Sequence, residues 1–238
     1  MKNVLEELAV TIFRSQFVKF EGCSRFDESE LGDVPHGWRV CELGELLDVL
    51  ETGSRPAGGV KEFNSGMPSI GAESIIGLGK FDYAKTKFVP VSFFEKMRRG
   101  HIQDMDVLVY KDGGKPGQFE PHISIFGAGF PYEQASINEH VYRARVKPPL
   151  TQAFLYFWLT TPLMMEEMRR RGTGVAIPGL NSTAVKELPI IVPPSDVVQK
   201  FDAIAEPIIR KLLIEATPTF PLPEATRFHE ASGGAAAA

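Results

Sequence analysis

The feature that most constrains the fold is a double change of hydrophobic periodicity along the chain. Near the N-terminus, apolar residues recur every three or four positions, which is the spacing of an amphipathic helix. From Gly37 to about Lys147 the pattern becomes short β-rich runs broken by Gly and Pro, and after Ser195 the helical spacing returns. We therefore predict an α+β fold, in which one mixed, β-rich domain is flanked by amphipathic helices of the coiled-coil type.

The same pattern divides the 238 residues into five segments. We expect a helix over residues 1–22, a polar linker over 23–36, the main domain over 37–194, a second helix over 195–216, and over 217–238 a tail that is disordered or left by cloning. Strands are predicted at Lys87–Val91, Asp106–Tyr110, His122–Phe126, His140–Val146 and Leu188–Val192. A helix is predicted over 151–171, bent at Thr161–Pro162, with its aromatic residues in the core.

Both flanking helices carry an apolar stripe that needs a partner. The N-terminal stripe consists of Leu5, Leu8, Ile12 and Phe13, and the C-terminal one repeats with 3-4-3-4 spacing at Val198, Phe201, Ala205, Ile208 and Leu212. We expect Ser195 to be the N-cap of the second helix and Pro207 to bend it. Two heptads do not form a stable coiled coil alone, so this helix requires either the first helix or another chain. The first helix is either part of a spacer or a cap on its own domain.

The charge balance limits how this chain can bind nucleic acid. The net charge is −4, but residues 37–194 contain 18 Lys and Arg against 17 Asp and Glu, a net of +1, while the flanks carry −5. Affinity for DNA rises with the number of phosphates neutralised, so a nearly neutral domain cannot bind by bulk attraction. Binding would have to use local basic loops or a basic partner.

Composition and motifs argue against membrane insertion and catalysis. No apolar run approaches the ~18 residues that span a bilayer, and Cys23 and Cys41 lack metal-ligand spacing, as expected of reduced thiols in a cytoplasmic protein. Phe126–Phe130 matches the FxGxG start of a methyltransferase cofactor site, but the companion Asp/Asn-Pro-Pro-Tyr tetrapeptide is absent, and we interpret the segment as a hairpin turn. We predict no catalytic residue, no metal and no cofactor in this chain.

Three loops combine side chains that read DNA. Arginine bonds bidentately to guanine or phosphate, and an amide side chain does the same with adenine. The loop Thr52–Gly59 offers a hydroxyl and a guanidinium, Tyr110–Gln118 offers two ammonium groups and an amide, and the long helix ends in three guanidiniums. We predict DNA contacts from Ser54, Arg55, Glu73, Ser74, Lys111, Lys115, Gln118, Arg169, Arg170, Arg171, Thr173 and Asn181.

Several of these residues also have a purely structural interpretation. Arg169–Arg171 would complement the dipole at a helix C-terminus and remain solvated. Asp112 would neutralise Lys111 within a tight turn, and Asn181 would only shape its loop. The pair Glu73–Ser74 either contacts a cytosine amino group or caps a turn.

Five segments, taken in order, carry a resemblance to a known family. They are Gly37–Glu45, Pro68–Ile75, Asp106–Gly113, the aromatic run Phe154–Leu159, and Gly172–Pro194 with the heptad helix that follows. Their order and spacing resemble one half of the specificity (S) subunit of type I restriction-modification enzymes, over roughly residues 1–215.

The resemblance implies sequence-specific recognition of duplex DNA without catalysis. In this family two target-recognition domains each read one half of a bipartite site, and antiparallel helices space them apart. The S subunit docks methylase (M) subunits, which bind S-adenosylmethionine and methylate adenine, and restriction (R) subunits join the complex. Residues 37–194 would then be one recognition domain, and the cofactor would lie on the methylase.

A single recognition domain leaves three interpretations open. The chain is an excised half of a longer subunit, a natural half-subunit that pairs with a copy of itself through its helices, or a single-domain relative from another modification system. Symmetric pairing predicts a palindromic bipartite target, because half-sites mirror the symmetry of the protein. The alternative function is an assembly scaffold that mainly holds methylase subunits through residues 1–20 and 195–215.

Overall fold

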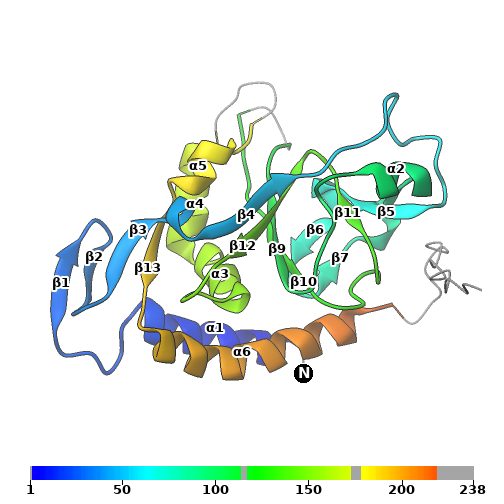
Figure 1. Cartoon of the computed structure of the whole chain (residues 1–238). Coiled ribbons are helices and arrows are strands. Elements are labelled where there is room, and N and C mark those ends of the chain that lie inside the picture. The colour runs from blue at the N-terminus through cyan, green and yellow to red at the C-terminus, as the bar shows by residue number, and fades with distance from the viewer. Residues whose placement is uncertain (1, 114–116, 173–177, 219–238) are drawn as a thin grey trace, which may run out of the picture.

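The structure, a computed structural model, describes residues 2–113, 117–172 and 178–218 and confirms the α+β class (Figure 1). Its helices are α1 (Lys2–Phe17), α2 (Val91–Lys96), α3 (Gln152–Leu159), α4 (Pro162–Arg171), α5 (Ser182–Lys186) and α6 (Ser195–Ala216). Its strands are β1 (Phe26–Ser29), β2 (Gly32–Pro35), β3 (Arg39–Glu42), β4 (Leu47–Thr52), β5 (Met67–Ile70), β6 (Ile75–Gly77), β7 (Lys80–Phe81), β8 (Lys87–Val89), β9 (Asp106–Tyr110), β10 (Ile123–Phe126), β11 (Ser136–Ile137), β12 (Val141–Val146) and β13 (Pro189–Val192). Most of the predicted strands and helices are therefore present within a few residues of their expected bounds.

The main sheet has the strand order β10-β9-β12-β4, and each neighbouring pair is antiparallel. A second sheet, β11-β5-β8, combines a parallel pair with an antiparallel one. The pairing of β13 with β3 joins the last strand of the chain to one of the first and closes the domain. Because β4, β9 and β12 are neighbours, the loops that follow β4 and β9 and precede β12 emerge at one edge of the main sheet.

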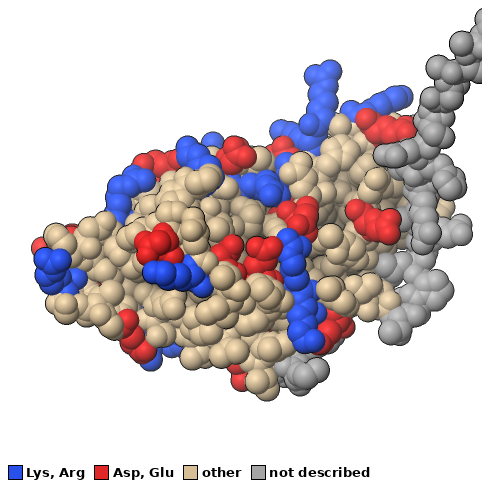
Figure 2. Space-filling view, turned by 60° about the horizontal axis from the view of Figure 1, so that its bottom comes forward, with Lys and Arg blue, Asp and Glu red and all other residues tan. Residues whose placement is uncertain are grey.

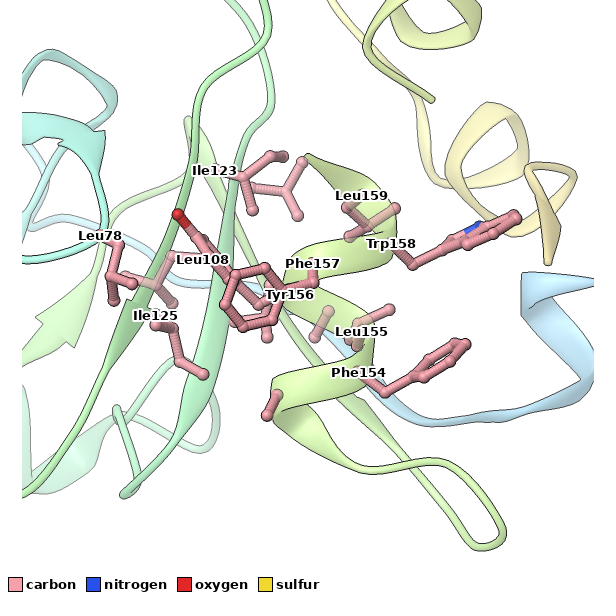
Figure 3. Close-up of a cluster of buried hydrophobic side chains, with 14 of the residues drawn as sticks. Leu78, Leu108, Ile123, Ile125, Phe154, Leu155, Tyr156, Phe157, Trp158 and Leu159 are labelled. Carbon is pink, nitrogen blue, oxygen red and sulfur yellow. The ribbon is translucent and has the colours of Figure 1, made fainter. Parts of the chain in front are cut away.

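The helix α3 forms the centre of the core. Seven consecutive residues, Ala153–Leu159, are buried, and a helix that is apolar all round is stable only when covered on every side. Its side chains lie against Leu108, Ile123 and Ile125 of the main sheet (Figure 3). The indole nitrogen of Trp158 donates to the Pro189 carbonyl oxygen at 3.0 Å. The prediction that these aromatic residues belong to the core is confirmed.

The helix expected over 151–171 is divided into α3 and α4 at the predicted proline. The hydroxyl of Thr161 accepts a hydrogen bond from the Met164 amide at 3.3 Å, and Pro162 occupies the first turn of α4. Proline suits that position because its missing N–H would have no partner within the helix. The chain changes direction here and carries Arg169–Arg171 away from the core.

The flanking helices α1 and α6 lie side by side and antiparallel along the main domain (Figure 1). Phe13 and Phe17 of α1 are buried, and their ring centroids lie 5.3 and 5.4 Å from that of Phe201 in α6. The ring of Phe13 also lies 5.4 Å from Phe154 of α3. The partner required by the α6 stripe is therefore supplied within the chain, and the interpretation of α1 as a cap on its own domain is supported.

This packing determines which stripe residues are accessible. All five heptad residues of α6 are buried, as is Phe13, whereas Leu5 and Ile12 are partly buried and Leu8 is 47% exposed. The buried side chains stabilise this domain and are not available to another subunit in this arrangement. The heptad residues are Val198, Phe201, Ala205, Ile208 and Leu212.

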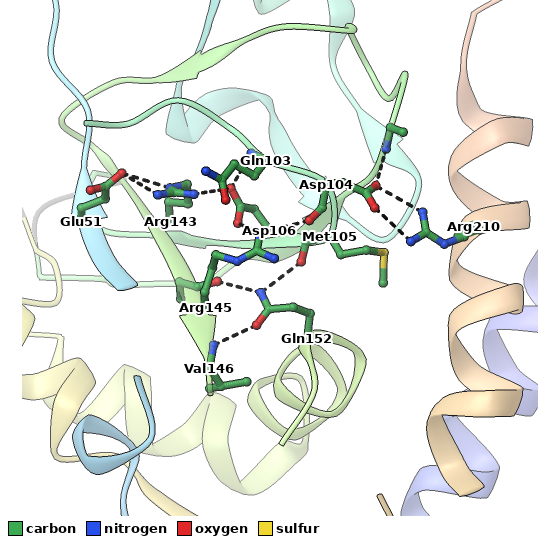
Figure 4. Close-up of polar contacts among 12 residues, drawn as sticks. Glu51, Gln103, Asp104, Met105, Asp106, Arg143, Arg145, Val146, Gln152 and Arg210 are labelled. Atoms are coloured by element: carbon green, nitrogen blue, oxygen red, sulfur yellow. Dashed lines mark hydrogen bonds and ion pairs between the residues drawn. The ribbon is translucent and has the colours of Figure 1, made fainter. Parts of the chain in front are cut away.

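A buried charge network fixes the strands that lead to the candidate loops (Figure 4). The carboxylate of Asp106 has no exposed surface and accepts hydrogen bonds from Arg143 at 3.0 Å, Arg145 at 2.5 Å and the Gln103 amide at 2.6 Å. Arg143 also bonds to Glu51 of β4, with its Nη2 at 2.9 Å. A buried charge is costly unless it is paired and hydrogen-bonded, so these contacts hold β4, β9 and β12 in one arrangement.

A further ion pair joins the loop before β9 to α6 (Figure 4). The Arg210 guanidinium donates to both carboxylate oxygens of Asp104, at 3.2 and 3.0 Å. This hydrogen bonding outweighs partial burial and holds the pKa of Asp104 below its ordinary value. The helix is thus attached to the main domain by charge as well as by apolar packing.

Two predictions about the ends of the domain were wrong. Residues 23–36, expected to be a linker, contain the hairpin β1–β2, in which the Asp27 carboxylate accepts from the Gly37 amide at 3.1 Å. Ser195 begins α6 but does not cap it, because Pro194 occupies the cap position and makes no side-chain cap hydrogen bond. Pro207 lies inside α6 without ending it, since the buried stripe on both sides of the proline offsets the one hydrogen bond lost, and the bend expected there stays a prediction.

The segment Phe126–Phe130 forms a turn, closed by a hydrogen bond from the Phe130 amide to the Gly127 carbonyl oxygen at 3.0 Å. It does not join a hairpin as predicted, because β10 belongs to the main sheet and the next strand, β11, to the second.

Candidate nucleic-acid interface

Three loops from distant parts of the sequence meet at the edge of the main sheet. Register places Tyr142 of β12 opposite Val109 of β9 and Thr52 of β4, so the residues just beyond these positions lie near one another. The chain continues from β4 to Ser54 and Arg55 and from β9 to Lys111, and it enters β12 through His140. The structure therefore brings two of the loops predicted to contact DNA to the same place.

The segment around residues 178–181, which includes the predicted contact Asn181, packs directly on the end of β9. The Leu180 amide donates to the Lys111 carbonyl oxygen at 2.7 Å, and the Gly113 amide donates to that of Pro178 at 3.1 Å. Asp112 and Gly179 form an isolated antiparallel bridge between these hydrogen bonds. A side chain at position 179 would collide with Asp112, which explains the glycine.

Charged side chains at this edge form a continuous chain of contacts. Lys111 and His140 each bond to the Asp112 carboxylate. His140 Nε2 lies 3.5 Å from Glu139 Oε1, and the same oxygen lies 2.5 Å from Nε of Arg55. These contacts run from Lys111 to Asp112, His140, Glu139 and Arg55, and they tie together the loops after β9, after β11 and after β4.

The Asp112 carboxylate lies at the middle of these contacts. Partial burial opposes its ionisation, but the hydrogen bonds from Lys111 and His140 outweigh that effect and hold its pKa below the ordinary value. The predicted pairing of Asp112 with Lys111 is confirmed, but Asp112 lies in the bridge with Gly179 and not in a tight turn. To bind a phosphate, the Lys111 ammonium would have to give up its ion pair with Asp112.

The C-terminus of α4 joins the same region through aromatic packing. The ring of Phe119 stacks on Tyr110 with centroids 5.7 Å apart and planes 6° apart. Gly172 lies against Phe119, where a Cβ would collide with the ring. Arg169 donates to Glu120 at 3.0 and 2.6 Å, so the end of α4 and the 117–120 segment are held together.

All three predicted arginines of α4 have carboxylate partners. Arg169 also lies 3.3 Å from Glu166, Arg170 lies 2.6 Å from Glu167, and Arg171 contacts Glu167 and Glu187 at 3.1 and 3.3 Å. They therefore do more than complement the helix dipole. Their side chains are exposed or partly exposed, as a contact with DNA requires.

The remaining predicted residues divide by accessibility. Ser74 is fully buried, so the prediction that it contacts a base is not supported; the chain turns inward there to enter β6. Asn181 is exposed but its side-chain oxygen caps α5 by accepting from the Ala184 amide at 2.8 Å, which is the structural role considered for it. Glu73 and Gln118 are exposed and Ser54 is partly exposed. Lys115 and Thr173 lie outside the described residues.

Sequence reasoning missed Glu139 and His140, although both belong to the charged chain of contacts. Their partners are Arg55 and Asp112, which lie 84 and 28 positions away, and no local pattern marks such pairs. Among the described residues no group of three or more His, Cys, Asp or Glu is arranged to hold a metal ion. No helix within 2–113, 117–172 and 178–218 is long and apolar enough to cross a membrane.

Comparison with known proteins gives the family. The profile of the type I restriction modification DNA specificity domain matches residues 35–216, which is more than half of the chain. The chain belongs to this family. The matched region begins at the end of β2 and closes with the last residue of α6, so it includes every segment of the candidate interface.

Relatives of this specificity-domain family agree with the assignment. The chain is 20% identical over 222 residues to the specificity subunit of the type I restriction enzyme MjaIX from Methanocaldococcus jannaschii, covering 89% of this chain and 48% of that subunit. The fold is similar to the crystal structure of the HsdS subunit from Thermoanaerobacter tengcongensis, with a TM-score of 0.51 and 15% identity, over 92% of this chain and 47% of that one. The chain thus spans about half the length of these relatives.

Proposed function

We propose that the chain recognises duplex DNA by sequence, as a specificity subunit or half-subunit of a type I restriction-modification system, and catalyses no reaction itself. It would read one half of a bipartite site. The observation that carries this proposal is the convergence at one edge of the loop with Arg55, the turn at Lys111–Gly113, and the C-terminus of α4. These segments come from distant parts of the sequence and present hydrogen-bonding groups of the kind that read base edges.

The charge distribution supports a reader of sequence more than a general DNA binder. On the α1–α6 side of the molecule, Figure 2 shows Lys and Arg interspersed with Asp and Glu. Every described cation predicted to contact DNA already has a carboxylate partner. Replacing that carboxylate with a phosphate gains little free energy, so the paired cations favour discrimination over bulk affinity.

The proposal includes two kinds of partner subunit. Methylase subunits would supply further phosphate contacts and carry the S-adenosylmethionine, and a restriction subunit would join the full complex in the cytoplasm. A role mainly as a scaffold is less well supported, because most of the apolar stripe that was expected to hold the methylase is buried within this chain.

Selection from a random duplex library tests the proposal. The purified chain is used alone and again with its cognate methylase, and bound duplexes are sequenced after several rounds. Enrichment of a short fixed motif is the expected result. No enrichment even with the methylase present would contradict sequence recognition and leave the scaffold as the better account.

A further inference from the structure

Three cations at the end of α2 differ from every described cation that is predicted to bind DNA. Lys96, Arg98 and Arg99 are exposed, and within the described residues none of them forms an ion pair or hydrogen bond through its side chain. They lie within four consecutive positions, where Glu95 is the one neighbouring acid. A cluster of unpaired guanidinium and ammonium groups is free to bind an anion without first losing a partner.

The backbone that follows this cluster is clamped to the candidate interface. The Gly100 amide donates to Glu51 Oε1 of β4 at 2.8 Å, and its carbonyl oxygen accepts from the Ile137 amide of β11 at 2.8 Å. A Cβ on Gly100, whose φ is +84°, would lie 2.6 Å from the Cα of Gly53. The backbone of this residue is therefore packed directly on the ends of β4 and β11.

The residues that follow these two strands belong to the chain of charged contacts. Gly53 is followed by Ser54 and Arg55, and Ile137 is followed closely by Glu139. Because Arg99 is bonded directly to Gly100, the C-terminal end of the basic cluster lies next to the loops that we propose to read bases.

The turn that carries the cluster is itself fixed. His101 Nε2 lies 3.1 Å from the Met97 carbonyl oxygen, and the His101 ring packs edge-on against Phe94 at 4.5 Å between centroids. These contacts hold the turn between Phe94 and His101 in place. The cations thus project from a rigid support, which lowers the entropy lost when they bind a ligand.

We propose that Lys96, Arg98 and Arg99 form a phosphate-binding strip that contacts the DNA backbone next to the base-reading loops. The inference rests on the proposed function, and it assigns affinity and sequence discrimination to different cations of the candidate interface. The unpaired strip supplies affinity that depends on salt and not on sequence, whereas the cations with carboxylate partners, such as Arg55 and Arg169, supply discrimination.

The test is the salt dependence of binding by the full chain, with methylase present if selection shows that it is needed. Fluorescence anisotropy is measured with two labelled duplexes, one carrying the selected motif and one of randomised sequence. The variant K96A/R98A/R99A should weaken binding to both duplexes by a similar factor. It should reduce the slope of log K against log salt by about 2 to 3, since each phosphate contact contributes about 0.9.

A matched control removes three exposed cations elsewhere. Arg14 of α1, Arg25 of the segment before β1, and Lys147 after β12 also lack ion pairs among the described residues, and R14A/R25A/K147A changes the net charge by the same amount. This control should keep the wild-type slope. If both triple variants lose the same amount of slope of log K against log salt, or if K96A/R98A/R99A keeps the wild-type slope, the proposed phosphate-binding role of the strip is contradicted.

A second variant, R98K/R99K, separates phosphate binding from base reading. Lysine keeps the charge but not the bidentate geometry, so the strip predicts an unchanged slope and an unchanged preference for the selected duplex. Loss of that preference would overturn the division of work by assigning the two arginines to base contacts. Failure of the proposed function itself is distinguishable, because the wild-type chain would then show no preference between the duplexes.

Discussion

At the scale of single residues, Asp106 determines whether the strands beneath the interface keep their arrangement. Its buried carboxylate holds Arg143 and Arg145, and the substitution Asp106→Asn keeps the shape while removing the charge. Leaving Arg145 without a counter-ion and Arg143 with Glu51 alone should lower the free energy of unfolding by about 3–5 kcal/mol, measured by urea denaturation. The control Asp196→Asn breaks an exposed pair with Lys200 and should leave stability close to wild type. Equal effects from the two substitutions would contradict a structural role for the buried charge.

The lowered pKa of Asp112 gives a pH dependence with a defined sign. A carboxyl group whose folded pKa is depressed stabilises the protein above its unfolded pKa, about 3.9, and this contribution is lost as the pH falls through the folded value. The variant Asp112→Asn should therefore be less stable than wild type near neutral pH, and the difference should disappear in strong acid. Urea midpoints measured from pH ~6 to ~2 test this. A difference that stays constant over this range would show that ionisation of Asp112 contributes nothing.

Residue identity predicts candidate contacts but not their partners. The loops with Arg55, Lys111 and Arg169 could be selected from the sequence because arginine and lysine in glycine-rich loops suit DNA. The acids that pair with them, such as Glu139 and Glu120, could not, since they meet only after the sheet has formed. The burial of Ser74 could not be predicted either, because serine occurs both in buried and in exposed positions of turns.

At the scale of elements, α1 is the clearest test of where the domain ends. Phe13 packs against aromatic rings from α3 and α6, and Phe13→Ala should lower the free energy of unfolding by about 3–5 kcal/mol. Leu8→Ala, on the exposed side of the same helix, should cost far less. Urea denaturation of both variants gives the comparison. Similar small losses would mean that α1 is an appendage and not part of the cooperative unit.

Elements with strong periodicity were predicted well, and short ones were not. The strand β9 was placed at its observed bounds because an unbroken apolar run marks a strand buried on both faces. The hairpin β1–β2 was missed because its residues are mostly exposed and polar, so no alternation marks it. Short helices such as α2 and α5 depend on tertiary contacts and capping, which a window of sequence does not report.

At the scale of the whole molecule, the chain presents one set of the loops that we propose to read DNA. It spans about half the length of the MjaIX specificity subunit and of the similar HsdS structure, so under the proposed function one copy would read one half-site. The nearly neutral main domain and the acidic flanks give a single copy little general attraction for DNA. Partners that add phosphate contacts would therefore raise affinity more than they change the sequence that is read.

The arrangement of the selected target should reveal how many copies act together. If two chains pair about a twofold axis, each presents the same loops in opposite orientation, and the selected duplex should contain an inverted repeat separated by a fixed spacing. If one chain acts alone, a single short motif is expected. Sedimentation equilibrium of the chain with and without methylase gives the number of copies independently of the DNA. A dimer that selects one unrepeated motif, or a monomer that selects an inverted repeat, would show that the reading loops described here do not set the target.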